Sequence, residues 1–261
     1  MQQTEIDLLA HELANIRLQA DLKLAVKIPS FAGKPYPLGR CLEVRDEMFK
    51  RIVAVLKQNN AQLAPLREYM QQENAELKKV WGSLRDEYFQ NALIVGHWYI
   101  DTANDTVNAN KPRVEIKPLA ASGFAAITSF EQFIQIAKPY WQVTVYKNTA
   151  FPALAPYLPL ICVSQSGASW LAAANDDMIK LACDSDFNLS EQILAKLPEP
   201  DGNLVQRWHA ALTKLQFPDE LLLQQGQTQS FCQLYRASNK ANDQAFRDRV
   251  VRAFMSLPKG V

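Results

Sequence analysis

The sequence predicts a mostly helical α+β fold. In this prediction an N-terminal long-helix bundle or hairpin is followed by a small mixed α/β region with a short antiparallel sheet and a helical tail. Helical spacing of apolar residues dominates up to about residue 108, and no proline occurs between Pro65 and Pro112. Alternating, strand-like segments appear only after Pro112. The chain has 261 residues, 48% of them hydrophobic and 21% charged, which is typical of a folded globular protein.

The first predicted helix covers residues 4–26. Its apolar residues recur every three or four positions and so share one stripe of a helix; they are Ile6, Leu9, Leu13, Ile16, Ala20 and Leu24. The segment 29–39 contains three prolines and two glycines, and it ends this helix because proline lacks the amide that a helix requires. A second helix is predicted from about Leu42 to Lys57.

Residues 63–107 are predicted to form one long helix. Apolar residues continue in two shifted stripes, the first through Leu66, Met70, Leu77, Val80 and Leu84, and the second through Tyr88, Ala92, Val95 and Tyr99. A continuous helix of this length would measure roughly 65 Å. Gly82 or Gly96 would be the place for a bend or a reversal. A helix of this kind favours a hairpin or bundle and offers a face for self-association.

Strands and shorter helices are predicted after Pro112. Arg113–Lys117 alternates as a strand does, and Ser129 is expected to cap a helix that runs to about Lys138, with Gln132 as its capping-box partner. Further strands are expected at 141–146, 160–163 and 168–172, and helices at 175–183, 189–197, 203–215, 218–225 and 241–256. The predicted domains are a helical region, 1–110, and an α+β region, 111–261, with a hinge near 198–202; one compact unit is the alternative.

Charge and apolar runs limit the partners and the compartment. The 28 Lys and Arg residues nearly balance the 27 Asp and Glu residues, which argues against a nucleic-acid-binding surface. The opening residues lack the basic segment of a secretory signal, and the most apolar run, 92–100, is too short to span a membrane. We therefore expect a cytoplasmic protein with neither nucleic acid nor membrane as its partner.

No metal or cofactor is predicted. The four cysteines, Cys41, Cys162, Cys183 and Cys232, are widely separated and form no CxxC pair. The nine glycines form neither a Walker loop nor a GxGxxG turn, the two glycine-rich patterns that bind nucleotide phosphates.

Three polar residues near the end of the predicted long helix are candidate catalytic residues. His97, Asp101 and Asp105 lie at positions i, i+4 and i+8, so a helix would place all three on one face. Such a column could orient a general base or offer ligands to a divalent metal. The alternative is structural: the histidine and a carboxylate support the helix, and Asp105 marks its solvated end.

Aromatic residues crowd the mixed region. Tyr140, Trp141 and Tyr146 combine apolar rings with polar tips, and they are the candidate ligand-binding residues of this group. The alternative is that these rings belong to a hydrophobic core.

Two function classes remain open. The first is an interaction or assembly protein that uses its long helices for self-association, as a homodimer, or for binding a protein partner. The alternative is an enzyme or a small-molecule-binding protein, with its site near the His97–Asp105 column and the aromatic region. The first is favoured because the sequence contains no complete motif for phosphate binding, metal binding or nucleophilic catalysis.

Overall fold

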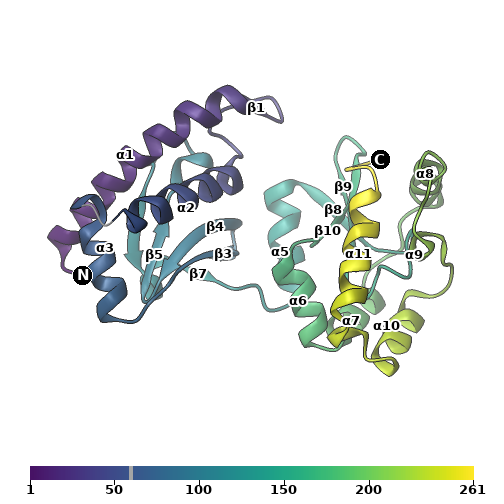
Figure 1. Ribbon diagram of the computed structural model, residues 1–261. Helices are drawn as coiled ribbons and strands as arrows, with labels where there is room; N and C mark the ends of the chain where they lie inside the picture. Colours follow the sequence, from purple (N-terminus) through teal and green to yellow (C-terminus); the bar gives the residue numbers. More distant parts are fainter. Residues whose placement is uncertain (59–60) are drawn as a thin grey trace. The chain divides into compact units, whose positions relative to one another are not determined.

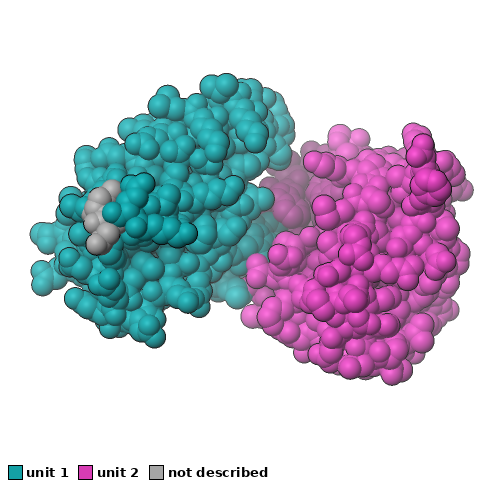
Figure 2. Space-filling view, viewed as in Figure 1, with its two compact units in different colours: residues 1–126 teal, residues 127–261 magenta. Residues whose placement is uncertain are grey.

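The computed structural model describes residues 1–58 and 61–261. The chain forms two compact units, Met1–Ala126 and Ile127–Val261, called unit 1 and unit 2 below (Figure 2). Each unit has its own sheet (Figure 1). Residues 111–126, which the sequence groups with the second region, supply the two outer strands of the sheet in unit 1.

Unit 1 is a curled antiparallel sheet covered by helices. Its elements are α1 (Gln3–Lys27), a small hairpin of β1 (Ser30–Phe31) and β2 (Lys34–Pro35), α2 (Cys41–Lys57), α3 (Ala64–Gln72), β3 (Leu77–Leu84), β4 (Tyr88–Val95), β5 (Trp98–Asp101), β6 (Glu115–Pro118), α4 (Leu119–Ser122) and β7 (Phe124–Ala125). The strand order is β6-β5-β4-β3-β7. Helices α1 and α2 lie side by side over this sheet (Figure 1).

The predicted first two helices are confirmed, and their apolar stripes form the core of unit 1. Of the α1 residues that the spacing placed inside, Ile6 is half-buried and the others are buried: Leu9, Leu13, Ile16, Ala20 and Leu24. They share one hydrophobic cluster with Leu93, Val95 and Ile100 from the sheet. Alternate residues of the same strands, Ala92 and Tyr99, belong to a separate cluster, as the two-residue period of a strand requires.

The prediction of an N-terminal long-helix bundle is wrong. Only residues 64–72 of the predicted long helix are α-helical, and the next segment folds as the meander β3-β4-β5. The reason is that its apolar residues are mainly aromatic or β-branched and pack well on a pleated sheet. A two-residue turn at Gly96 and His97 joins β4 to β5. Gly96 has a φ of 52°, and a Cβ there would lie 2.5 Å from the hydroxyl of Tyr69, so the turn requires glycine.

Unit 2 combines a short antiparallel sheet with many helices. The strands are β8 (Val143–Lys147), β9 (Leu160–Ser164) and β10 (Ser169–Ala172), in the order β10-β9-β8. The helices are α5 (Phe130–Trp141), α6 (Asp176–Asp184), α7 (Asn188–Lys196), α8 (Gly202–Leu212), α9 (Glu220–Leu223), α10 (Thr228–Ala237) and α11 (Gln244–Ser256). The predicted short sheet and helical tail are therefore present. Helix α10 was not expected from the sequence.

The capping signal at Ser129 in unit 2 is confirmed. The hydroxyl of Ser129 accepts a hydrogen bond from the amide of Gln132 and caps α5. Residues 198–201 of the segment 198–202, where a hinge is predicted, lie between α7 and α8, and Gly202 begins α8. Within the described ranges, no helix combines the length and apolar character needed to cross a membrane.

Candidate functional site

A buried ion-pair network in unit 1 is centred on Arg17 of α1. Its guanidinium donates from Nε to Oδ1 of Asp21 at 2.7 Å and from Nη1 to Oδ1 of Asp105 at 3.0 Å. Nη2 approaches the second oxygen of Asp105 at 3.3 Å, and Nη1 also donates to the carbonyl of Thr102 at 2.6 Å. Arg17 is fully buried, so these acceptors compensate for the water that its charge has lost.

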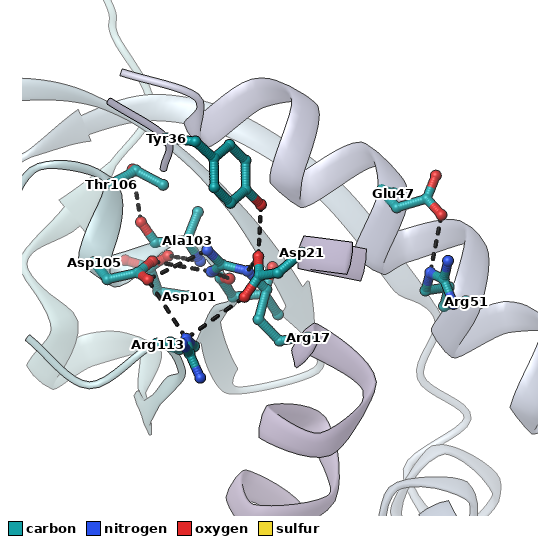
Figure 3. Close-up of polar contacts among 11 residues, drawn as sticks. Arg17, Asp21, Tyr36, Glu47, Arg51, Asp101, Ala103, Asp105, Thr106 and Arg113 are labelled. Carbon is teal, nitrogen blue, oxygen red and sulfur yellow. Dashed lines mark hydrogen bonds and ion pairs between the residues drawn. The ribbon is translucent and has the colours of Figure 1, made fainter. Parts of the chain in front are cut away.

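The network is held in place by two elements. Arg17 and Asp21 lie one helical turn apart on α1, where side chains at i and i+4 meet. Asp105 lies in a short 3₁₀ turn after β5, residues 104–106. The carboxylate of Asp101 accepts from the amide of Ala103 at 2.8 Å, and the hydroxyl of Thr106 donates to the carbonyl of Ala103 at 2.7 Å. These bonds fix the turn that directs Asp105 toward Arg17 (Figure 3).

Tyr36 and Arg113 complete the cluster (Figure 3). The hydroxyl of Tyr36 donates to Oδ1 of Asp21 at 2.5 Å, and burial together with this carboxylate raises the pKa of Tyr36. Nε of Arg113 lies 3.5 Å from Asp21 and 3.9 Å from Asp105. The Arg113 side chain is 48% exposed, so it is the most exposed member of the cluster.

An apolar groove of about 580 Å³ adjoins this cluster. Its walls are Leu18, Leu22, Ala25 and Val26 of α1 with Tyr36 and Pro37, and its polar residues are Asp21, Asp105 and Arg113. Leu22 is 78% exposed and Val26 is 83% exposed, and Leu18 precedes them at the same four-residue spacing. These three residues are called the α1 stripe below. The helix therefore has a buried apolar face and a second apolar face that unit 1 leaves uncovered.

The surface beside the α1 stripe has a surplus of positive charge. Lys23 and Arg51 share the single carboxylate of Glu47, at 2.7 Å and 2.9 Å. Lys27, in the last turn of α1, forms no ion pair with the described residues. The carboxylates of the groove, by contrast, are already paired with Arg17. The charges available to a partner at this surface are therefore cations.

Asp101 is buried and is not one of the residues that line the groove. Its second carboxylate oxygen accepts from Nε2 of Gln90 at 2.6 Å. Burial raises the pKa of Asp101 to about 7, and the negative charge of Glu115 on the paired strand acts in the same direction. A carboxyl of this kind can exchange a proton near neutral pH.

The predicted column of His97, Asp101 and Asp105 is not formed as a helical face. His97 is exposed in the turn between β4 and β5, Asp101 ends β5, and Asp105 follows in the 3₁₀ turn. Of the three, Asp105 belongs to the groove. Sequence reasoning missed Arg17, Asp21, Tyr36 and Arg113. The helical spacing of Arg17 and Asp21 was a readable signal, but nothing local connected it to Asp105.

The three predicted ligand-binding aromatics lie in unit 2. Tyr140 and Trp141 are at the end of α5, and Tyr146 is in β8. The Trp141 ring packs edge-on against Phe133 at 5.7 Å and against Trp170 at 6.2 Å between ring centroids. Trp141 therefore supports neighbouring rings of this unit.

The described part of the chain contains no group of three or more His, Cys, Asp or Glu side chains placed to hold a metal ion. Comparisons with protein-family models, curated proteins and solved structures gave no match to this chain.

Proposed function

We propose that the chain is an interaction or assembly protein whose groove in unit 1 binds an acidic amphipathic helix of a protein partner. The α1 stripe is the observation that carries this proposal. Leu22 and Val26 expose most of their surface one helical turn apart and line the same groove. Apolar side chains gathered around a concave surface are typical of a protein-binding site.

The spacing of the stripe favours a helical occupant. Residues at i, i+4 and i+8 form a ridge along α1, and a ridge packs into the groove between the side-chain rows of another helix. The surplus of Lys23 and Lys27 next to this ridge, together with the exposed guanidinium of Arg113, favours glutamate or aspartate at the edges of that helix.

Binding is supported better than catalysis in this groove. Arg17, Asp21 and Asp105 satisfy one another, and the hydroxyl of Tyr36 is bonded to Asp21. Groups bonded in this way hold the groove in shape. The alternative of an enzyme built on His97, Asp101 and Asp105 has less support, because His97 lies in an exposed turn and is not among the groove residues.

The cytoplasm is the compartment we propose for this function. All four cysteines are free thiols, and two of them, Cys162 and Cys232, are buried. Free thiols persist most readily in a reducing compartment.

Two synthetic peptides of about 18 residues, or five helical turns, test the proposal. One carries a leucine stripe with glutamate at its edges, and the other has lysine in place of glutamate. Fluorescence anisotropy is expected to show tighter binding of the acidic peptide. Leu22→Ser is expected to weaken that binding about tenfold or more, because a leucine side chain contributes roughly 1.5–3 kcal/mol when it is buried. Arg113→Gln should weaken the binding of the acidic peptide and should not weaken the binding of the lysine peptide.

The matched control is Leu234→Ser on α10, where another leucine is 57% exposed. This variant should bind the acidic peptide as the wild type does. Equal affinity of wild type and Leu22→Ser for the acidic peptide would refute the proposal. Analytical sedimentation of both proteins without peptide tests whether the chain forms a homodimer through the same surface. If the wild type is a dimer and Leu22→Ser is a monomer, the occupant of the α1 stripe is a second copy of this chain and not an acidic helix.

A further inference from the structure

Unit 2 contains a cavity of about 410 Å³ with aromatic walls. Trp170 and Leu171 of β10 line it, as do Trp208 of α8 and Phe254 of α11. Cavities of this size lie within the range that small organic ligands occupy, and aromatic walls contribute large apolar contact areas. The walls predict a flat, largely apolar ligand.

Trp208, one of the residues that line this cavity, has a buried indole N–H that is an unsatisfied donor. Trp208 is only 1% exposed, and its Nε1 has no hydrogen-bond partner among the described residues. Its ring packs edge-on against Phe151, with centroids 5.5 Å apart. A buried donor without a partner is costly, on the order of 1–3 kcal/mol, and buried indole N–H groups usually have an acceptor. An acceptor atom on a bound molecule would remove this cost.

Lys259 supplies a positive charge to the same cavity. It is exposed and lines the cavity together with Leu257 and Met255. In the part of the chain that the structure describes, its ammonium group forms no ion pair. An ammonium group without a counter-ion beside an apolar cavity favours an anionic group on the ligand.

Two features hold the cavity walls in position. Residue 261 pairs with β10 as an added strand would: the amide of Ser169 donates to the carbonyl of Val261 at 2.9 Å, and the amide of Val261 donates to the carbonyl of Ser169 at 3.0 Å. This pairing keeps the segment that contains Lys259 next to Trp170 and Leu171. The ring of Trp141 supports Trp170 from the side. The site is therefore largely preformed, which reduces the ordering cost of binding.

From these observations we infer that unit 2 binds a small aromatic molecule with an anionic, hydrogen-bond-accepting group. The ring lies against Trp170, Trp208 and Phe254, and the anion accepts from the indole N–H of Trp208 and pairs with Lys259. This inference is independent of the groove in unit 1, since every residue it uses belongs to unit 2.

A pair of fluorescent probes tests the inference on the whole chain. 1-Anilinonaphthalene-8-sulfonate carries the ring system and the anion, and N-phenyl-1-naphthylamine carries the same rings without the sulfonate. We expect one sulfonate probe per chain, with energy transfer from tryptophan. Lys259→Met and Trp208→Phe should each lower the affinity for the sulfonate probe about five- to tenfold. Each should change the affinity for the neutral probe by less than about twofold.

Two controls separate the cavity from other apolar surface. Phe217→Ser removes a ring that is 92% exposed and does not line the cavity, and this variant should bind both probes as the wild type does. Circular dichroism would reveal whether Trp208→Phe disturbs folding. Lys259 is on the surface, so Lys259→Met still tests the contact with the anionic group of the probe in that case. The inference is overturned if Lys259→Met binds the sulfonate probe as tightly as the wild type, or if neither probe binds at a single site.

Discussion

Unit 1 and unit 2 differ in where their charged side chains lie: unit 1 buries several of them, and unit 2 keeps them at its surface. The buried charged residues of the described chain are Arg17, Arg45, Glu47, Asp101 and Asp105, and all of them belong to unit 1. Unit 2 buries neutral polar groups such as Asn148 and Ser190, and its ion pairs lie at the surface. The stability of unit 1 should therefore depend on particular charges and on pH, whereas unit 2 relies on an aromatic interior. The three predictions below test this difference.

The largest effect is expected for Arg17→Met. The substitution leaves Asp105 and Asp21 without their buried counter-ion, and removing one partner of a buried pair typically costs 3–5 kcal/mol. Hydrogen–deuterium exchange should show faster exchange across α1 and little change in α11. Urea denaturation followed by circular dichroism should show the corresponding loss in the free energy of unfolding.

Lys23→Met is the matched control, because Lys23 is a cation of the same helix whose ion pair with Glu47 is exposed on the lysine side. The Lys23→Met substitution should lower the free energy of unfolding by less than about 1 kcal/mol. A similar cost for Arg17→Met and Lys23→Met would mean that the buried network does not hold unit 1 together.

A smaller effect, dependent on pH, is expected for Asp101→Asn. The folded chain binds the proton of Asp101 up to about pH 7, whereas an exposed aspartate loses it near its ordinary pKa of 3.8. Folding therefore takes up a proton between these pH values, and the free energy of unfolding falls as pH rises through this window. The asparagine variant lacks this penalty and should be more stable than the wild type above pH 7, by on the order of 2–4 kcal/mol.

The advantage of Asp101→Asn should shrink as pH falls toward 4 and disappear below about pH 3, because the wild-type carboxyl is then protonated in both states. Asparagine can still accept from the amide of Ala103, and the amide of Gln90 can turn to present its oxygen. Thermal unfolding of both proteins from about pH 3 to about pH 9 measures the difference. A stability gap that does not change with pH would contradict the raised pKa.

The sequence was informative where one residue pattern permitted one structure. The α1 segment combines a spacing of three and four with leucine and alanine, which favour a helix, and Ser129 has the local chemistry of a cap. The segment after Gln72 was ambiguous, because apolar residues at a spacing of three and four also fall on alternate sides of a strand. Its aromatic and β-branched content, with the turn at Gly96, favoured a sheet.

The candidate site was harder to predict because it depends on long-range contacts. Arg17 and Asp105 are 88 positions apart, and only the packing of α1 on the sheet brings them together. Asp105 was a predicted site residue, but the structural basis for choosing it, a helical column with His97, is absent from the described fold. The exposure of Leu22 and Val26 could not be read from their residue types, since apolar residues on a helix are usually buried.

The smallest effect is expected for Arg249→Met in unit 2. Arg249 donates to Asp219 from Nε at 3.0 Å and from Nη2 at 2.9 Å, a two-point contact comparable to the one that Arg17 makes with Asp105 through Nη1 and Nη2. Both side chains of this pair are partly exposed, so the loss should be about 1 kcal/mol or less in low salt and should shrink in 1 M NaCl. The cost of Arg17→Met should change little over the same salt range, because its network is shielded from ions. Urea denaturation of both variants at the two salt concentrations makes this comparison. If salt affects the two arginines equally, burial is not what distinguishes unit 1 from unit 2.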